Sequence, residues 1–80
     1  MNRQEITSKT LEVFQKVFGS QTPVTENSSA ENIDKWDSLN HILLIQELER
    51  TFQLKFDLFE IIELKDVQGI IDYIFSKSEK

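Results

Sequence analysis

The chain has 80 residues, of which 39% are hydrophobic and 29% are charged, with two glycines, one proline and no cysteine. A chain this short forms one domain at most, residues 1–80, and it buries only roughly 60–65% of its unfolded surface, which leaves no room for a deep, dry active-site cleft. The composition is typical of a compact helical domain. The lack of cysteine excludes disulfides, thiol catalysis and a cysteine-based zinc site, and it fits a reducing compartment.

The negative charge gathers in the middle of the chain. The formal net charge is −5; residues 26–66 hold ten acidic and four basic side chains, a net of −6, and the remaining residues contribute +1. This pattern argues against nucleic acid and against anionic membranes, which both select Lys and Arg clusters. It suggests basic protein partners, although a surface that is acidic only for solubility fits equally well. Without a segment of signal-peptide or membrane-spanning type, we expect a cytoplasmic protein.

The first predicted element is an amphipathic helix over about residues 3–18. Its apolar residues recur at three- and four-residue spacing: Ile6, Val13, Phe14 and Val17, with Leu11 and Phe18 beside them. Asn2 and Glu5 stand at the spacing of a capping box, which predicts the start of the helix, and Gly19 predicts its end.

The next 17 residues, 20–36, read SQTPVTENSSAENIDKW and have the composition of a loop. A loop this long in a small domain tends to be functional or mobile. We expect Val24, Ile33 and Trp36 to anchor it in the core. The stretch Asn27, Ser28 and Ser29 is interpreted as a plain solvated loop.

A second helix is predicted over about residues 38–52, with an apolar face wider than one core contact needs. Leu39, Ile42, Ile45 or Gln46, and Phe52 continue a single stripe, and Leu43 and Leu44 cannot both lie on it. We therefore expect this helix either to pack centrally or to expose part of its apolar face to a partner.

Two further helices complete the predicted fold. Asp57 and Glu60, at capping-box spacing, indicate a short helix of about two turns. A last helix starts at the cap candidate Asp66, and its stripe consists of Val67, Ile70, Ile71, Ile74 and Phe75. Gly69 costs this helix roughly 1 kcal/mol against alanine, which suggests close packing there. The prediction is an all-α four-helix bundle with three longer helices, one short helix and a long first loop.

Asp37, Ser38 and His41 invite comparison with a hydrolytic triad, but their arrangement argues against one. Asp37 directly precedes Ser38 and would cap the helix instead of orienting the imidazole, and no glycine-rich turn supplies an oxyanion hole. His41 is the only histidine, so a histidine-rich metal site is excluded. Asp57 and Glu60 lack the spacing of a calcium loop and are interpreted as caps.

Ser38 has a second interpretation. If Asp37 is the N-cap, Ser38 is the first helical residue, and its hydroxyl lies at the positive end of the helix dipole, where free N–H groups favour an attached anion such as a phosphodiester. The long preceding loop would let a modifying enzyme reach it. Helix physics alone leaves open that Ser38 is simply a favourable residue near a helix start.

Two segments carry a resemblance to a known family. The segment DSLNHILLIQELERTF resembles the prosthetic-group segment of acyl carrier proteins, and DVQGIIDYI is similar to the final helix of that family. The helix order, the long first loop and the acidic character also agree, so the resemblance covers essentially the whole chain.

The resemblance implies a non-catalytic carrier with 4'-phosphopantetheine attached at Ser38, between Asp37 and Leu39. A phosphopantetheinyl transferase (holo-synthase) would add the arm from coenzyme A with magnesium, and the arm's thiol would carry acyl groups to enzymes of fatty acid, polyketide or related specialised biosynthesis. We expect a monomer. On the same analogy, an acyl chain would lie among residues between the second and third helices: Leu44, Leu48, Phe52, Ile61 and Ile62.

Partner enzymes of this family usually dock basic patches onto acidic side chains of the second helix, and here the sequence departs from the pattern. Asn40 and Leu43 stand where acids are common, and Arg50 interrupts the acidic end. The remaining docking candidates are Glu47, Glu49, Asp57 and Glu60, with Asp37 and Glu63. Docking should be less purely electrostatic, with Leu43 as an apolar contact. Two alternatives stay open: a peptidyl or aminoacyl carrier loaded by an adenylating enzyme, and a small helical adaptor without an arm.

Overall fold

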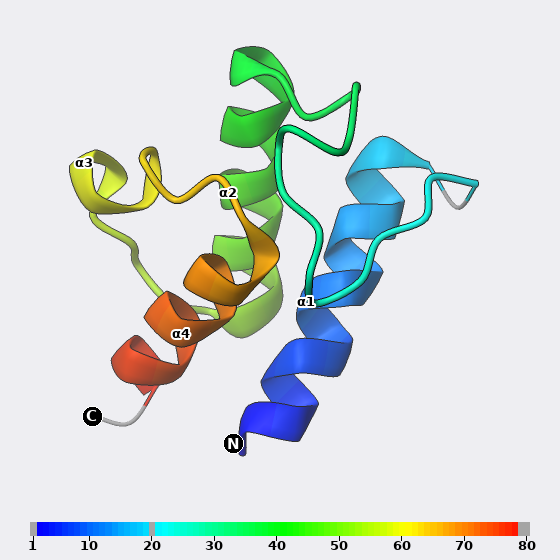
Figure 1. Ribbon diagram of the computed structural model, residues 1–80. Helices are drawn as coiled ribbons and strands as arrows, with labels where there is room; N and C mark the ends of the chain where they lie inside the picture. The colour runs from blue at the N-terminus through cyan, green and yellow to red at the C-terminus, as the bar shows by residue number, and fades with distance from the viewer. Residues whose placement is uncertain (1, 20, 79–80) are drawn as a thin grey trace.

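The computed structural model describes residues 2–19 and 21–78, and over these residues the chain is all-helical, with four helices and no strand (Figure 1). The helices are α1 (Arg3–Phe18), α2 (Ser38–Phe52), α3 (Leu58–Ile61) and α4 (Val67–Ser78). The predicted small helical bundle is confirmed. In Figure 1, α2 stands between α1 and α3, and α1 packs against both α2 and α4. No helix in the described part of the chain has the length and hydropathy to cross a membrane.

The ends of α1 follow the local signals in the sequence. The Asn2 side chain accepts a hydrogen bond from the Glu5 backbone N–H at 2.8 Å, and the Glu5 carboxylate accepts one from the Asn2 backbone N–H at 3.4 Å, which confirms the capping box. Gly19 ends the helix with φ of +99°, a conformation that side chains with a Cβ rarely adopt.

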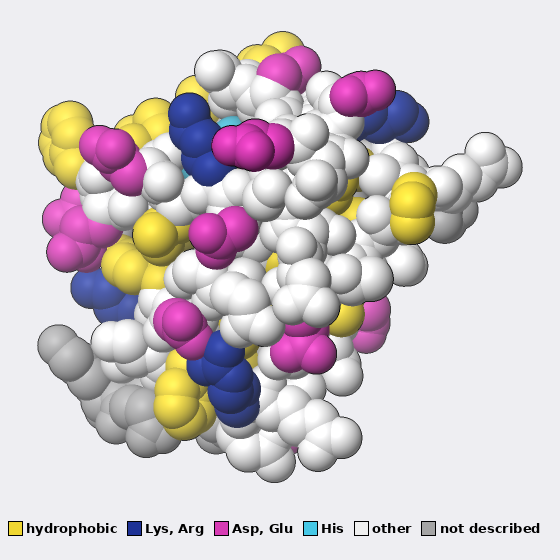
Figure 2. All heavy atoms as spheres, viewed as in Figure 1, with side chains coloured by type: hydrophobic (Ala, Val, Ile, Leu, Met, Phe, Trp, Pro, Cys, Tyr) yellow, Lys and Arg dark blue, Asp and Glu magenta, His cyan; other side chains and the backbone are white. Residues whose placement is uncertain are grey.

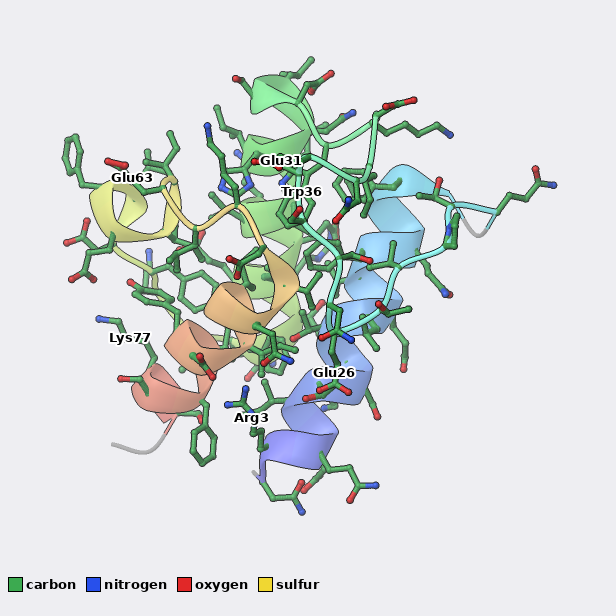
Figure 3. All side chains as sticks on the ribbon, viewed as in Figure 1. Arg3, Glu26, Glu31, Trp36, Glu63 and Lys77 are labelled. Carbon is green, nitrogen blue, oxygen red and sulfur yellow. The ribbon has the colours of Figure 1, made fainter. Side chains whose placement is uncertain are left out.

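The long loop is anchored in the core as predicted. Val24, Ile33 and Trp36 are all buried. Trp36 lies under the loop, between α1 and α2 (Figure 3), where its ring packs edge-on against Phe14 with a centroid distance of 5.0 Å. Phe18 lies next to the same indole, at 6.0 Å. Such aromatic pairs contribute about 0.5–1.5 kcal/mol beyond their buried area, so this cluster fixes the loop against α1.

The interpretation of residues 27–29 as a plain solvated loop is wrong for the two serines. Ser28 and Ser29 are half-buried, and the Ser28 carbonyl accepts a hydrogen bond from the Val67 backbone N–H at 3.0 Å. Ser29 pairs with Asp66 in an isolated antiparallel bridge. The first turn of α4 has backbone N–H groups without helical partners, and the loop supplies one of the missing acceptors.

The buried stripe of α2 also differs from the prediction. It consists of His41, Leu44, Ile45 and Leu48, which recur at the spacing i, i+3, i+4, i+7. Leu39 is 69% exposed and Ile42 39% exposed, so neither lies on the core face. The predicted stripe contained apolar residues, with Gln46 as an alternative to Ile45, but not His41, whose imidazole is buried.

Helix α3 is held to α4 through the hydroxyl of Tyr73. Asp57 caps α3 by accepting from the Phe59 backbone N–H at 2.9 Å, as predicted. In a capping box the Glu60 carboxylate would accept a hydrogen bond from the Asp57 backbone N–H. Here the Tyr73 hydroxyl accepts from that N–H at 2.9 Å and donates to the Glu60 carboxylate at 3.1 Å. The tyrosine therefore stands between the two residues that were expected to form a capping box.

Gly69 lies in the first turn of α4, where the sequence suggested close packing. A Cβ at this position would lie 2.7 Å from Oδ1 of Asp66 and 3.5 Å from Leu64. Asp66 Oδ1 accepts a hydrogen bond from the Gly69 backbone N–H, so the close neighbour is the carboxylate that caps the helix. The predicted close approach is confirmed.

Thr10, which no sequence signal pointed to, is fully buried in α1, and its hydroxyl has no hydrogen-bond partner among residues 2–19 and 21–78. Removing an unsatisfied buried hydroxyl relieves a desolvation penalty. We expect Thr10→Val to raise the free energy of unfolding by about 1 kcal/mol, measured by urea denaturation. Thr51→Val, at an exposed position of α2, is the matched control and should leave it nearly unchanged. A destabilised Thr10→Val protein would mean that the hydroxyl is satisfied in solution.

Candidate functional site

At the start of α2, Asp37 and Ser38 are the two candidates for the N-cap of the helix, and only one of them has this role. Asp37 has extended backbone geometry, with φ of −101° and ψ of −176°, and its carboxylate accepts a hydrogen bond from the Asn40 backbone N–H at 2.9 Å. Asp37 is therefore the N-cap, as predicted. Ser38 is the first helical residue and is exposed to solvent. The helix thus begins without using the Ser38 hydroxyl.

A cleft of about 380 Å³ opens beside Ser38. Three segments line it: the long loop, the first two turns of α2, and the link that follows α3. The lining residues are Ala30, Trp36, Asp37, Ser38, His41, Ile42, Ile62 and Lys65. The volume lies within the range of small-molecule sites, and the lining combines apolar walls with a few polar groups, as such sites do.

Backbone hydrogen bonds fix the two walls that are far apart in the sequence. The Ala30 N–H donates to the Lys65 carbonyl at 2.8 Å, next to the pairing of Ser28 with Val67. The long loop and the link between α3 and α4 therefore form one edge of the cleft. The side chain of Asn40, in the first turn of α2, donates to the Lys35 carbonyl at 2.7 Å and so ties the end of the loop to this helix.

His41 forms the buried floor and connects three segments. The Trp36 indole Nε1–H donates to His41 Nδ1 at 2.8 Å, and His41 Nε2 lies 3.2 Å from the Ile61 carbonyl oxygen. An indole N–H is only a donor and a carbonyl only an acceptor, so the imidazole is neutral, with its proton on Nε2. Both ring nitrogens are engaged, and neither can act as a base toward Ser38. The arrangement argues against hydrolysis at this site.

Burial lowers the pKa of His41 below its ordinary value of 6.5; the hydrogen bond to Ile61 opposes this shift, and the nearby charge of Lys65 adds to it. The unfolded chain therefore binds a proton on His41 at a higher pH than the folded protein does. We expect the free energy of unfolding to be constant above about pH 6.5 and to fall as the pH decreases below it, by at most about 1.4 kcal/mol per pH unit.

Urea denaturation between pH 7.5 and 5.5 measures this dependence in a range above the ordinary pKa values of carboxylates. The His41→Gln protein, which lacks the imidazole, serves as the control and should show a nearly flat profile. Equal slopes in both proteins would contradict the assignment to His41.

The residues expected to line an acyl-chain pocket occupy two different environments. Leu44, Leu48 and Ile61 are fully buried, and Phe52 is half-buried against the core. Ile62 is 38% exposed and lines the cleft beside Ser38. Of the five, only Ile62 is brought to the cleft; the role of the others as a chain pocket stays a prediction.

The acidic docking candidates are largely engaged within the molecule. Glu47 forms ion pairs with Lys16 at 3.2 Å and with Arg50 at 3.8 Å. The Glu49 carboxylate accepts from the Phe56 backbone N–H at 2.8 Å. Asp57 caps α3, and Glu60 pairs with Lys77 from α4 at 3.9 Å. Lys77 extends from α4 in Figure 3, and Glu63, in the link after α3, lies on the same side of the molecule.

Among the described residues, α2 and the α3 region also expose large apolar side chains, of which Ile42 and Ile62 line the cleft. The large ones on the surface are Leu39, Ile42, Leu43, Leu58, Phe59 and Ile62, all from α2 and the α3 region. Figure 2 shows hydrophobic side chains gathered at the α3 edge of the molecule. Leu43, predicted as an apolar docking contact, is 44% exposed; Phe59, which was not predicted, is 87% exposed. The run DLFEIIEL gave no signal for this, because a short helix has too few turns to define an apolar face.

The chain matches no protein-family model and no curated protein. The chemistry of the site therefore rests on its own geometry: an accessible hydroxyl at the first position of a helix, beside a partly apolar cleft with one cation at its edge. Such a site can hold an attached anionic group, and both nitrogens of its histidine are already engaged.

Proposed function

We propose that this protein is a non-catalytic carrier of the acyl carrier type, with a 4'-phosphopantetheine arm attached to Ser38. The arm's thiol would hold acyl groups as thioesters for enzymes of fatty acid, polyketide or related specialised biosynthesis. The single observation that carries the proposal is the exposed Ser38 hydroxyl at the first position of α2, left free because Asp37 caps the helix. The resemblance of DSLNHILLIQELERTF to the prosthetic-group segment of acyl carrier proteins supports the same function.

The residues around Ser38 fit a phosphodiester chemically. The N-terminus of α2 presents backbone N–H groups and the positive end of its dipole, which favour a negative group by about 0.3–1 kcal/mol. Lys65 adds a positive side chain to the lining of the adjacent cleft. His41 is neutral and both its nitrogens are hydrogen-bonded, so it adds no charge toward the group and does not attack it. When attached, the arm would supply the thiol that the cysteine-free chain lacks.

We further propose that partner enzymes recognise this carrier mainly through apolar contacts. Glu47 and Glu49 are occupied by internal partners, so a basic partner would have to compete for them. Leu43 on α2 and Phe59 on α3 are exposed, and apolar side chains at a surface are typical of interaction sites. The partners would be a phosphopantetheinyl transferase and the acyl-loading and acyl-using enzymes. The protein would act as a monomer in the cytoplasm.

The test is an intact-mass measurement. The purified chain is incubated with coenzyme A, magnesium and a broad-specificity phosphopantetheinyl transferase, and we expect its mass to increase by one phosphopantetheine group. A chain that stays unmodified beside a known carrier modified in the same tube would contradict the proposal and favour a helical adaptor without an arm. Loading of the modified protein by an adenylating enzyme, in preference to an acyl transferase, would indicate a peptidyl or aminoacyl carrier.

A further inference from the structure

We infer that the arm rests in the cleft beside Ser38 and that Lys65 is the residue that positions its phosphodiester. This inference depends on the proposed function, because it concerns the same attachment site. It adds that the arm has a preferred place on the protein surface between visits to partner enzymes. It also assigns that place to the cleft between α2 and the link after α3.

Lys65 is suited to this role because it lines the cleft and because its side chain forms no ion pair with a carboxylate of the described residues. Ser38 and Lys65 line the same cleft, so a phosphate on the Ser38 oxygen would lie beside a cleft that this cationic residue borders. The backbone of Lys65 is fixed, because its carbonyl accepts from the Ala30 N–H at 2.8 Å. Over residues 2–19 and 21–78, Lys65 makes no ion pair with any carboxylate, unlike Arg3, Lys16, Arg50 and Lys77. Because its backbone is held in place and its ammonium group has no carboxylate partner, Lys65 is able to form an ion pair with a phosphate.

The charges around the phosphate favour this placement. Asp37 is the one carboxylate that lines the cleft, and its oxygen accepts from the Asn40 N–H at the cap. The other polar group, His41, is neutral. Lys65 is therefore the only charged side chain in the lining that attracts an anion. It lies in residues 26–66, the part of the chain with a net negative charge, where an anion without a cationic partner would be repelled.

The cleft also offers an apolar wall for the branched, methyl-bearing part of the arm. Ile42 from α2 and Ile62 from the end of α3 are each more than a third exposed, and both line the cleft. Trp36 contributes to the same lining, while its indole N–H is held by His41. When the arm covers these side chains, apolar surface is removed from water, and this burial stabilises the arm in the cleft. The two interactions, ionic at Lys65 and apolar at the isoleucines, would act together.

The experiment is nuclear magnetic resonance on the modified protein, with the chain labelled in ¹³C and ¹⁵N and the arm unlabelled. We expect nuclear Overhauser contacts from the geminal methyl groups of the arm to Ile42, Ile62 and the Trp36 indole. Lys65→Gln should reduce these contacts by about two- to fivefold, the range that an exposed ion pair supports. Lys55→Gln is the matched control, because Lys55 is exposed outside the cleft and carries the same charge. It should leave the contacts unchanged.

Two further measurements separate the ionic contribution of Lys65 from the apolar contribution of the isoleucines. About 1 M salt should weaken the contacts of the wild-type protein toward those of Lys65→Gln, because salt screens exposed charges. Ile62→Ala should weaken them without abolishing modification. A protein modified at Ser38 whose arm shows no contact with the cleft would overturn the inference and leave the proposed function intact, as would equal effects of Lys65→Gln and Lys55→Gln. A wild-type chain that accepts no arm would overturn both.

Discussion

The Ser38→Ala protein is expected to fold normally and to gain no phosphopantetheine, whereas the wild-type chain is modified completely. Folding survives because Asp37 supplies the cap and the Ser38 hydroxyl is not needed to start α2. An exposed serine-to-alanine change in a first helical turn alters the free energy of unfolding by about 0.5 kcal/mol or less. Modification is lost because the only proposed attachment oxygen is removed. Intact mass after incubation with coenzyme A, magnesium and transferase measures the effect.

Two matched variants make this result specific. Ser8→Ala removes an exposed serine from α1 and should be modified as the wild type is. Asp37→Ala removes the cap and should cost about 0.5–2 kcal/mol of stability, which Ser38→Ala does not. Modification of Ser38→Ala to the same extent as the wild type would place the arm on another residue. A large loss of stability in Ser38→Ala would mean that this serine, and not only Asp37, caps the helix.

The Leu44→Ala protein is expected to lose about 2–5 kcal/mol of its free energy of unfolding. Leu44 is fully buried in the core cluster, and removing its side chain forfeits the transfer free energy and leaves a cavity. For a domain of this size each kcal/mol shifts the melting temperature by roughly 4–8 °C, so the loss would be visible in a thermal melt. Because small domains are stable by only about 5–15 kcal/mol, this single change would remove a large share of the total.

The neighbouring Leu43 provides the control on the same helix. Leu43 is 44% exposed, so Leu43→Ala should change the free energy of unfolding by only about 0.5 kcal/mol. Paired urea denaturation curves of the two variants test which leucine faces the core. A similar loss in both proteins would mean that α2 is rotated from its described position, and the exposed apolar surface proposed for docking would then be in doubt.

Local signals were enough to predict where most helices begin and end. The Asn2–Glu5 capping box, the Gly19 stop and the Asp37 cap all act within one helical turn, so the sequence contains both partners of each interaction. The stripe of α4 was predicted equally well, because Val67, Ile70, Ile71 and Ile74 are all buried. Figure 3 shows the opposite case in Arg3, which extends from α1 toward α4 and pairs there with Asp72 at 2.6 Å. No local pattern indicates a pair so far apart in the chain.

The errors at α2 and in the loop have the same origin. The apolar pattern left His41 out of the α2 stripe, yet it is buried because Trp36 and Ile61 satisfy both its nitrogens. Those partners come from the long loop and from α3. Ser28 was misread in the same way, because its acceptor role depends on Val67 being brought next to it. In each case the environment of a polar group was set by a residue far away in the sequence.

The sequence by itself therefore determined the four helices, the cap at Asp37 and the free hydroxyl of Ser38, since these depend on neighbours three or four residues apart. Only the tertiary structure decided that Ala30, Ile62 and Lys65 meet beside that hydroxyl and form a cleft. The physical reason is that these residues are brought together by packing and by backbone pairing between the loop and the start of α4. Such contacts depend on the arrangement of the whole core and leave no periodic signal in the chain.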